Sequence, residues 1–256
     1  MKIILDSRKS IHANAAEYFE KSKHLREKLE RVKAAISDVE QRISLLDKKQ
    51  SLAASDAIGK IVVKKVVKKE WYEKFHFFFT TGGLLCIAGK EAKQNEVLVA
   101  KHFDENDLFY HADVQGAAAT ILKGGAKPGV LEQDLREVAQ FAASFSRAWK
   151  GGFSSVDVYA VKREQVSKSA QSGEYVGKGG FIIRGERKWF KNTELKVSVG
   201  RSEQGKLFVV PSVAVQGKAG FVEIAPGLEK KQYCKLVAES FSLSKQEIET
   251  LIPLLP

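Results

Sequence analysis

Residues 13–50 carry the pattern that most limits how this chain can fold, because they contain neither Gly nor Pro and repeat apolar side chains at heptad spacing. The two apolar series are Leu29, Ile36 and Ile43, and Tyr18, Leu25, Val32, Val39 and Leu46. Alternating steps of three and four residues place both series along one side of an α-helix. We therefore expect residues 1–57 to form an N-terminal coiled-coil helix.

A helix with one apolar stripe needs a partner, because the stripe otherwise stays in water. The sequence has one helix of this kind, so it predicts a homodimer through residues 18–46. Packing of the helix on the chain's own domain and a solvated single helix stay open as alternatives. The apolar residue types in the seam do not fix the direction of pairing.

Charge narrows the class of partner. The chain of 256 residues has a net charge of +11. Such an excess favours nucleic acid, or less often an anionic membrane, over a merely soluble basic protein. No apolar run approaches the ~20 residues of a membrane span, and the N-terminus is too short for a signal peptide. Cys86 and Cys234 sit in apolar surroundings typical of reduced thiols. We expect a cytoplasmic protein that does not bind membranes.

The rest of the chain alternates short apolar runs with turns, which predicts an α+β fold: a compact mixed sheet-and-helix domain. Two apolar runs flank Gly82 and Gly83, as in a hairpin. Helical spacing predicts helices at 89–101, at about 131–150 and near 229–240, and Ser244 with Glu247 matches a capping box. Paired lysines and β-branched residues predict a basic strand or arm at 60–67. We divide this part into a nucleic-acid-binding domain at 58–200 and C-terminal strands and helices at 201–256 that pack on it.

His111 and Asp113 are the two residues that best fit a catalytic or metal site. They are two apart on a predicted strand and therefore share a face. A pair of this kind is more often a hydrogen-bonded structural pair. We expect that role, with Trp71 also structural, and expect no catalytic residue, metal or cofactor. A nuclease-like, nucleic-acid-processing enzyme centred on His111 and Asp113 is the second hypothesis.

Polar, basic and aromatic side chains in several Gly-rich stretches form the candidate RNA-binding set. Lysine and arginine neutralise phosphates, Gly-rich backbone approaches them closely, and aromatic rings offer stacking faces. Ordinary surface charge is the alternative. The candidates are Lys90, Lys93, Gln94, Asn95, Lys123, Gln165, Ser167, Lys168, Tyr175, Lys178, Arg184, Arg187, Lys188 and Trp189.

Several blocks at these positions keep the order and rough spacing of a known domain. They are Trp71-Tyr-Glu-Lys-Phe, Gly89-Lys-Glu-Ala-Lys-Gln-Asn-Glu, Tyr110-His-Ala-Asp-Val-Gln-Gly-Ala, Gln165-Val-Ser-Lys, Gly173-Glu-Tyr and Phe181-Ile-Ile-Arg-Gly. Together they resemble the NFACT-R domain, the RNA-binding module of the NFACT family of ribosome quality-control factors (the NEMF/Rqc2 group). Residues 10–19 are similar to the coiled-coil segment that precedes this domain in long members.

The resemblance implies a non-catalytic RNA-binding protein that acts on tRNA or ribosomal RNA, at the ribosome, in quality control or translation. The sequence shows no match to the NFACT-N domain or the helix-hairpin-helix module of the long members, so we do not carry over tail elongation. The loop at 124–129 also departs from the family's Pro-rich pattern. A DNA-binding scaffold that dimerises through its helix is a further hypothesis.

Overall fold

The structure, a computed structural model, describes residues 5, 8–55, 70–168 and 179–256, and only the backbone of residues 34 and 42–55. It divides into one unit at Met1–Val67 and another at Lys68–Pro256. The predicted basic strand at 60–67 and two candidate residues, Tyr175 and Lys178, lie outside the described residues. Along the described residues, no helix is both long and apolar enough to cross a bilayer.

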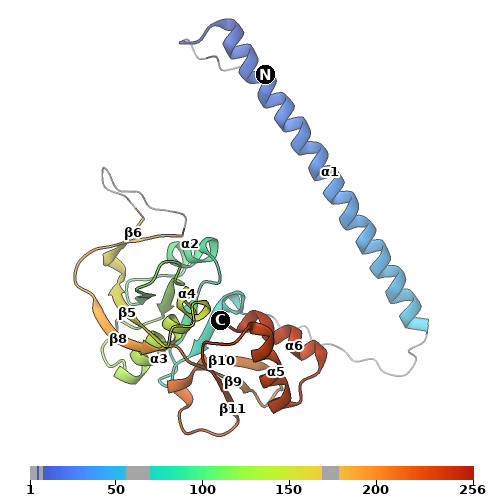
Figure 1. Cartoon of the computed structure of the whole chain (residues 1–256). Helices are drawn as coiled ribbons and strands as arrows, with labels where there is room; N and C mark the ends of the chain where they lie inside the picture. The colour runs from blue at the N-terminus through green and yellow to red at the C-terminus, as the bar shows by residue number, and fades with distance from the viewer. Residues whose placement is uncertain (1–4, 6–7, 56–69, 169–178) are drawn as a thin grey trace. The chain divides into compact units, whose positions relative to one another are not determined.

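The first unit is α1 (Ile11–Ser55), a single helix of 45 residues (Figure 1). It confirms the predicted long N-terminal helix. Its seam side chains are well exposed, with 61% of Leu25, 52% of Ile36 and 53% of Val39 open to solvent. The apolar stripe is therefore available to a partner helix, and its pairing stays a prediction.

The second unit is built on a six-stranded antiparallel sheet with the order β1-β2-β4-β3-β5-β8. Gly83, with φ of +80°, turns the chain between the first two strands, so the predicted hairpin is confirmed. The strands are β1 (His76–Phe79), β2 (Leu85–Ala88), β3 (Leu108–Ala112), β4 (Thr120–Leu122), β5 (Ser155–Lys162) and β8 (Lys188–Glu194).

Helices cover both faces of this sheet. On one face, α3 (Glu132–Ser144) packs Val138 and Phe141 into a cluster with Tyr110. On the other face, α2 (Ala92–Lys101) packs Leu98 into a second cluster with Phe109. Phe109 and Tyr110 are neighbours on β3, and their side chains point to opposite faces of the sheet, as the alternation along a strand requires. The predicted α+β class is confirmed.

Two helix predictions need correction. The predicted helix at 131–150 is broken, because Ser146 adopts an extended conformation and its Oγ accepts the Ala148 N–H at 3.2 Å. This cap starts a separate helix, α4 (Arg147–Lys150). The predicted helix at 89–101 begins only at Ala92, since Glu91 is extended.

Smaller elements complete the layer that contains α2. A two-stranded sheet joins β6 (Val166–Ser167) to β7 (Ile182–Ile183). The 3-10 turns η1 (Trp71–Lys74) and η2 (Arg163–Gln165) precede β1 and β6. Val166 joins the same apolar cluster as Leu98, so this small sheet rests on the outer layer of the domain.

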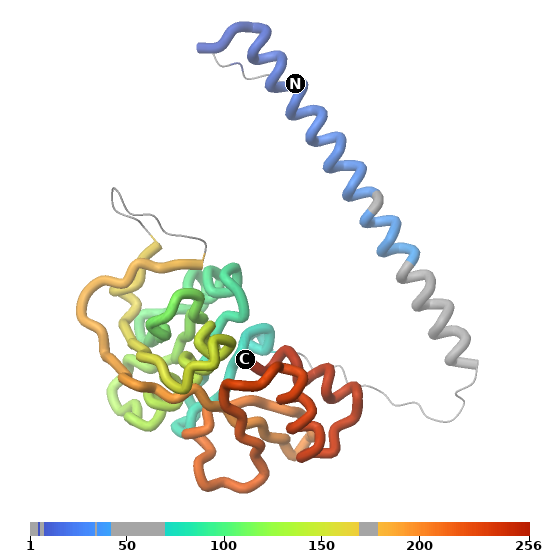
Figure 2. Tube along the Cα trace, viewed as in Figure 1, coloured from blue at the N-terminus to red at the C-terminus, as the bar shows by residue number. Residues whose placement is uncertain are grey.

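The C-terminal elements share the core of α3. A sheet of order β10-β9-β11 brings Val199 and Val209 into the cluster of Phe141. Trp149 meets Tyr233 there, with ring centroids 5.9 Å apart. These elements also contact the first described residues of the unit (Figure 2), because Lys206 pairs with Glu73 at 2.9 Å and Leu254 lines a pocket together with Tyr72. The elements are β9 (Val197–Arg201), β10 (Leu207–Pro211), η3 (Ser212–Val215), β11 (Phe221–Ile224), α5 (Lys230–Phe241), α6 (Lys245–Leu251) and η4 (Ile252–Leu254).

The predicted capping box is confirmed, because the Ser244 N–H donates to Glu247 at 2.8 Å and the Ser244 Oγ accepts the Glu247 N–H at 3.3 Å. The predicted boundary between residues 200 and 201 falls inside β9.

Candidate nucleic-acid interface

Three neighbouring strands place aromatic side chains in a row on the face of the sheet opposite α3. His111 on β3 is opposite Tyr159 on β5, and Tyr159 is opposite Trp189 on β8. Their ring centroids are 5.8 and 5.4 Å apart. Phe109 continues the row at 6.2 Å from His111, with the two rings nearly parallel. We call Phe109, His111, Tyr159 and Trp189 the aromatic row.

Cationic side chains cover the outer end of the aromatic row. The Arg187 guanidinium lies 4.5 Å from the Tyr159 centroid and 5.8 Å from that of Trp189. Lys191 Nζ lies 4.1 Å from the Trp189 centroid and pairs with Asp157 at 2.7 Å. Trp189 remains 37% exposed. This end therefore combines an accessible ring with positive charge, the arrangement that favours stacking of a base beside a phosphate.

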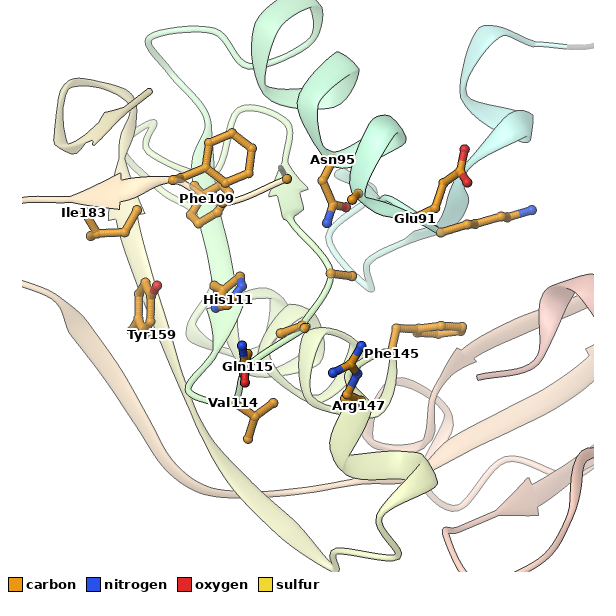
Figure 3. A pocket seen from close by; sticks show the side chains of 18 residues that line it. Glu91, Asn95, Phe109, His111, Val114, Gln115, Phe145, Arg147, Tyr159 and Ile183 are labelled. Carbon is orange, nitrogen blue, oxygen red and sulfur yellow. The ribbon is translucent and has the colours of Figure 1, made fainter. Parts of the chain in front are cut away.

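A cavity of about 640 Å³ opens at the inner end of the row. Figure 3 shows His111 between Tyr159 on one side and Arg147 on the other, with Gln115 close by. The remaining walls come from the start of α2, the loop before β4 and the segment that leads into β7. The cavity lining is Lys90, Glu91, Ala92, Asn95, Phe109, His111, Val114, Gln115, Gly116, Ala117, Ala118, Phe145, Arg147, Tyr159, Gly179, Gly180, Phe181 and Ile183.

Two glycines allow the segments that line the cavity to pack closely. Gly116 has φ of +81°, and a Cβ there would lie 3.0 Å from Arg147 Nε, so glycine leaves room for the arginine. Gly179 has φ of +80° and packs on α2, where a Cβ would lie 2.7 Å from the Ala92 Cβ. Both positions combine a left-handed backbone with a close approach that a side chain would block.

Glu96 on α2 holds the far wall in place. Its Oε1 accepts the Gly179 N–H at 3.1 Å and pairs with Lys168 Nζ at 2.8 Å. Lys168 also lies 5.9 Å from the ring centroid of Phe181. The segment at 179–181 is thereby tied to the first turns of α2.

The cavity is positively charged at its rim and neutral at its centre. Burial lowers the pKa of His111, while hydrogen bonds to the backbone of Ala112 and Ala117 and the charge of Asp113 oppose that shift. Its imidazole is therefore uncharged at neutral pH. Partial burial lowers the pKa of Lys90. Among the described residues, Lys90 and Arg147 have no carboxylate partner, and Glu91 is the one acidic side chain in the cavity lining.

Three of the candidate RNA-binding residues make internal contacts instead. Asn95 is buried, and its Oδ1 accepts the Ala119 N–H at 3.2 Å. Lys123 pairs with two carboxylates, those of Asp104 and Asp107, each at 2.5 Å. Gln165 donates to the carbonyls of Arg184 and Glu186 at 3.1 and 2.6 Å. These side chains stabilise the domain and have little capacity left for a phosphate.

The other described candidates are spread around the cavity and the small sheet. Lys93 and Arg184 are exposed, and Ser167 lies on β6. Gln94 Oε1 accepts the Lys90 N–H at 3.1 Å, and Lys188 pairs with Glu132 at 2.8 Å. Trp71 stacks on His102 with centroids 4.2 Å apart. Of the predicted set, the structure thus brings Lys90, Asn95 and His111 together at the cavity, and Arg187 and Trp189 together at the outer end of the row.

His111 and Asp113 do not form the expected hydrogen-bonded pair. Within the described part of the chain, no hydrogen bond joins their side chains, and Asp113 is exposed just beyond β3. The Asp113 carboxylate acts on His111 only through its charge. In the same part of the chain, no group of three His, Cys, Asp or Glu residues is placed to hold a metal ion.

Phe109, Arg147, Tyr159 and Phe181 were missed as site residues. The sequence predicted one continuous helix through Arg147, so it did not indicate that Arg147 is the first residue of a separate helix. Tyr159 lies within an apolar stretch of β5, at residues 158–161, and only period-two alternation separates its face from that of Val158. The pairing of β3 with β5 and β8 is what assembles the row, and a single sequence does not reveal that order.

Comparisons with known proteins relate this chain to a family. The family description "NFACT protein RNA binding domain" matches residues 74–185. The archaeal Rqc2 homolog aRqcH of Methanocaldococcus jannaschii is 39% identical over 201 residues, which span 75% of this chain and 30% of that protein. The ribosome quality control complex subunit NEMF homolog of Drosophila melanogaster is 30% identical over 192 residues, which span 74% of this chain and 19% of that protein.

This chain therefore spans less than a third of either relative. Among solved structures, the C-terminal part of the fibronectin/fibrinogen-binding protein from Streptococcus suis is 21% identical. The match covers 73% of this chain and 78% of that one, with a TM-score of 0.40.

Proposed function

This chain is an NFACT-R protein of the NEMF/Rqc2 family, and from that premise we propose that it binds RNA in ribosome quality control. Its net charge of +11 supports a polyanionic partner. The proposed partners are tRNA or ribosomal RNA on the ribosome, and the proposed place of action is therefore the cytoplasm.

The arrangement of the aromatic row and its cations is the observation that carries this proposal. Among the described residues, Arg187 and Arg147 make no ion pair, whereas Lys123, Lys168, Lys188 and Lys191 all do. Cations without a carboxylate partner remain available to neutralise phosphate. They lie beside rings on a sheet face, and such faces are used to stack unpaired bases of RNA.

The proposed role is binding without catalysis. A neutral His111 and an exposed Asp113 supply no hydrogen-bonded acid–base pair. The RNA and DNA hypotheses separate in a competition experiment with tRNA, a ribosomal RNA fragment and DNA of equal length. DNA that competes as well as RNA would favour the scaffold hypothesis instead.

Arg187→Gln is expected to reduce the salt dependence of RNA binding. Loss of one phosphate contact should lower the slope of log K against log salt by about 0.7 for single strands or about 0.9 for a duplex. Trp189→Ala should instead weaken binding by ~1–3 kcal/mol with little change of slope, because stacking involves no counterions. Titrations of labelled tRNA at several salt concentrations measure both effects.

Arg201→Gln is the matched control for Arg187→Gln. It removes the same charge, but the Arg201 guanidinium is already held by Glu247 at 2.5 Å. Its slope should equal that of the wild type. Equal slopes in the Arg187→Gln variant and the wild type would exclude this surface as the phosphate contact.

We also propose that α1 forms a homodimer through residues 18–46. Ile36→Asp combined with Val39→Asp should convert a dimer to a monomer, because the two charges would enter a dry seam. Ser37→Asp with Gln41→Asp adds the same charge on the opposite side of the helix and should leave the dimer intact. Sedimentation equilibrium at tens of micromolar gives the mass. A monomeric wild type, or a dimer that persists in the seam variant, rules out this pairing.

A further inference from the structure

The cavity beside His111 has a volume that can hold one nucleotide. Resting on the RNA-binding function above, we infer that it receives a single unpaired nucleobase of the bound RNA, with an adjacent phosphate on Arg147. Its volume of about 640 Å³ lies inside the ~300–1,000 Å³ range of small-molecule sites. A paired base stays stacked within its helix, so only an unpaired base can enter.

Aromatic rings line the inner walls. Phe109 and Phe181 meet edge to face, with centroids 5.7 Å apart. The His111 ring is nearly parallel to Phe109, at an interplanar angle of 9°, and Tyr159 stands beyond it. Phe109 and Tyr159 are buried, so the partly exposed rings of His111 and Phe181 are the ones that can offer a stacking face to a planar base of any sequence.

Polar groups at the same depth can contact the edge of the base. The backbone of Ala112 and Ala117 engages the N–H of a neutral His111, which leaves the other ring nitrogen as an acceptor, and the exposed Gln115 presents an amide with a donor and an acceptor. Asn95 contributes less, because its Oδ1 already accepts the Ala119 N–H. These groups can read the hydrogen-bonding edge of a base, while an apolar ligand would leave them unsatisfied.

The charges at the rim orient the nucleotide. Arg147 lies over Gly116 on one side, with no ion pair among the described residues. Glu91 lies at the start of α2 and repels a phosphate from its own part of the rim. The ribose-phosphate should therefore leave the cavity on the Arg147 side, away from Glu91.

Three RNA hairpins that differ at one position test this inference. The first carries one unpaired base, the second has an abasic residue at that position, and the third is fully paired. The wild-type protein should bind the first about 5- to 150-fold more tightly than the other two, the range expected for one stacked base. Phe181→Ala should remove this preference while the affinity for the paired hairpin stays unchanged. Arg201→Gln should keep it.

The outcomes separate the two proposals. If no hairpin binds, the proposed RNA-binding function fails. If all three bind equally, or the abasic hairpin binds like the first, the function stands and the nucleotide site is overturned. A preference that survives Phe181→Ala in a folded variant overturns it as well.

Crosslinking locates the base without any variant and so covers the case in which Phe181→Ala does not fold. A hairpin with 4-thiouridine at the unpaired position is irradiated with the wild-type protein, and the adduct is mapped by mass spectrometry. The expected adducts lie within residues 109–118 or 179–183. Adducts confined to other parts of the chain contradict the assignment.

Discussion

Glu137→Ala is expected to lower the free energy of unfolding by about 3 kcal/mol, because it removes a buried carboxylate with charged hydrogen bonds and leaves a cavity. Glu137 on α3 is fully buried. It accepts the Thr81 N–H at 2.8 Å and the Thr81 hydroxyl at 2.6 Å. The carboxylate thus fixes the turn between β1 and β2 to the helix that covers them. Urea denaturation followed by circular dichroism measures the change.

Glu132→Ala is the matched control on the same helix. Glu132 is more than half exposed and pairs with Lys188 on the surface, so its removal should cost less than about 1 kcal/mol. If the two variants unfold at the same urea concentration, the buried carboxylate does not stabilise the turn as inferred.

Acidification should destabilise the second unit through His76. Burial, followed by the charges of Lys90 and Lys230, lowers the pKa of His76 from 6.5 to about 3. The unfolded chain then binds a proton below pH 6.5 that the folded protein binds only near pH 3. Stability is therefore complete above pH 6.5 and falls as pH decreases through this window. The contribution of His76 is up to about 1.4 kcal/mol per pH unit.

His76→Phe removes this proton uptake and keeps an aromatic ring beside Phe145, whose centroid is 4.2 Å away. Its unfolding free energy should fall less steeply between pH 6.5 and 4 than that of the wild type. His24→Phe, on exposed α1, serves as the control and should follow the wild type. Parallel curves for His76→Phe and the wild type would mean that His76 titrates normally.

The parts of the fold that the sequence predicted correctly follow from local sequence patterns. The heptad seam predicted α1, the Gly82–Gly83 pair predicted the β1–β2 hairpin, and Ser244 with Glu247 predicted the start of α6. Each depends on residues close in sequence. The break at Ser146 was missed, because apolar spacing continues from α3 into α4 across the cap.

The candidate site was less predictable, because it depends on contacts between distant strands. Lys123 and Gln165 matched the chemistry of phosphate binding, yet the carboxylates and carbonyls that engage them lie 16 or more residues away. Arg187 and Trp189 were predicted, but their partner Tyr159 was not, since it lies on the neighbouring strand. Residue types therefore indicated which side chains could bind RNA, and only the strand order showed which of them lie together.

The two contacts of Glu96 make one part of this protein suitable for insertions. The same carboxylate oxygen holds Lys168 at 2.8 Å and Gly179 at 3.1 Å, so both ends of the stretch between them are anchored on α2. Closing a longer stretch between fixed ends costs only about 0.6 kcal/mol for each doubling of its length. A short peptide tag inserted between Lys168 and Gly179 should therefore leave the cavity wall in position.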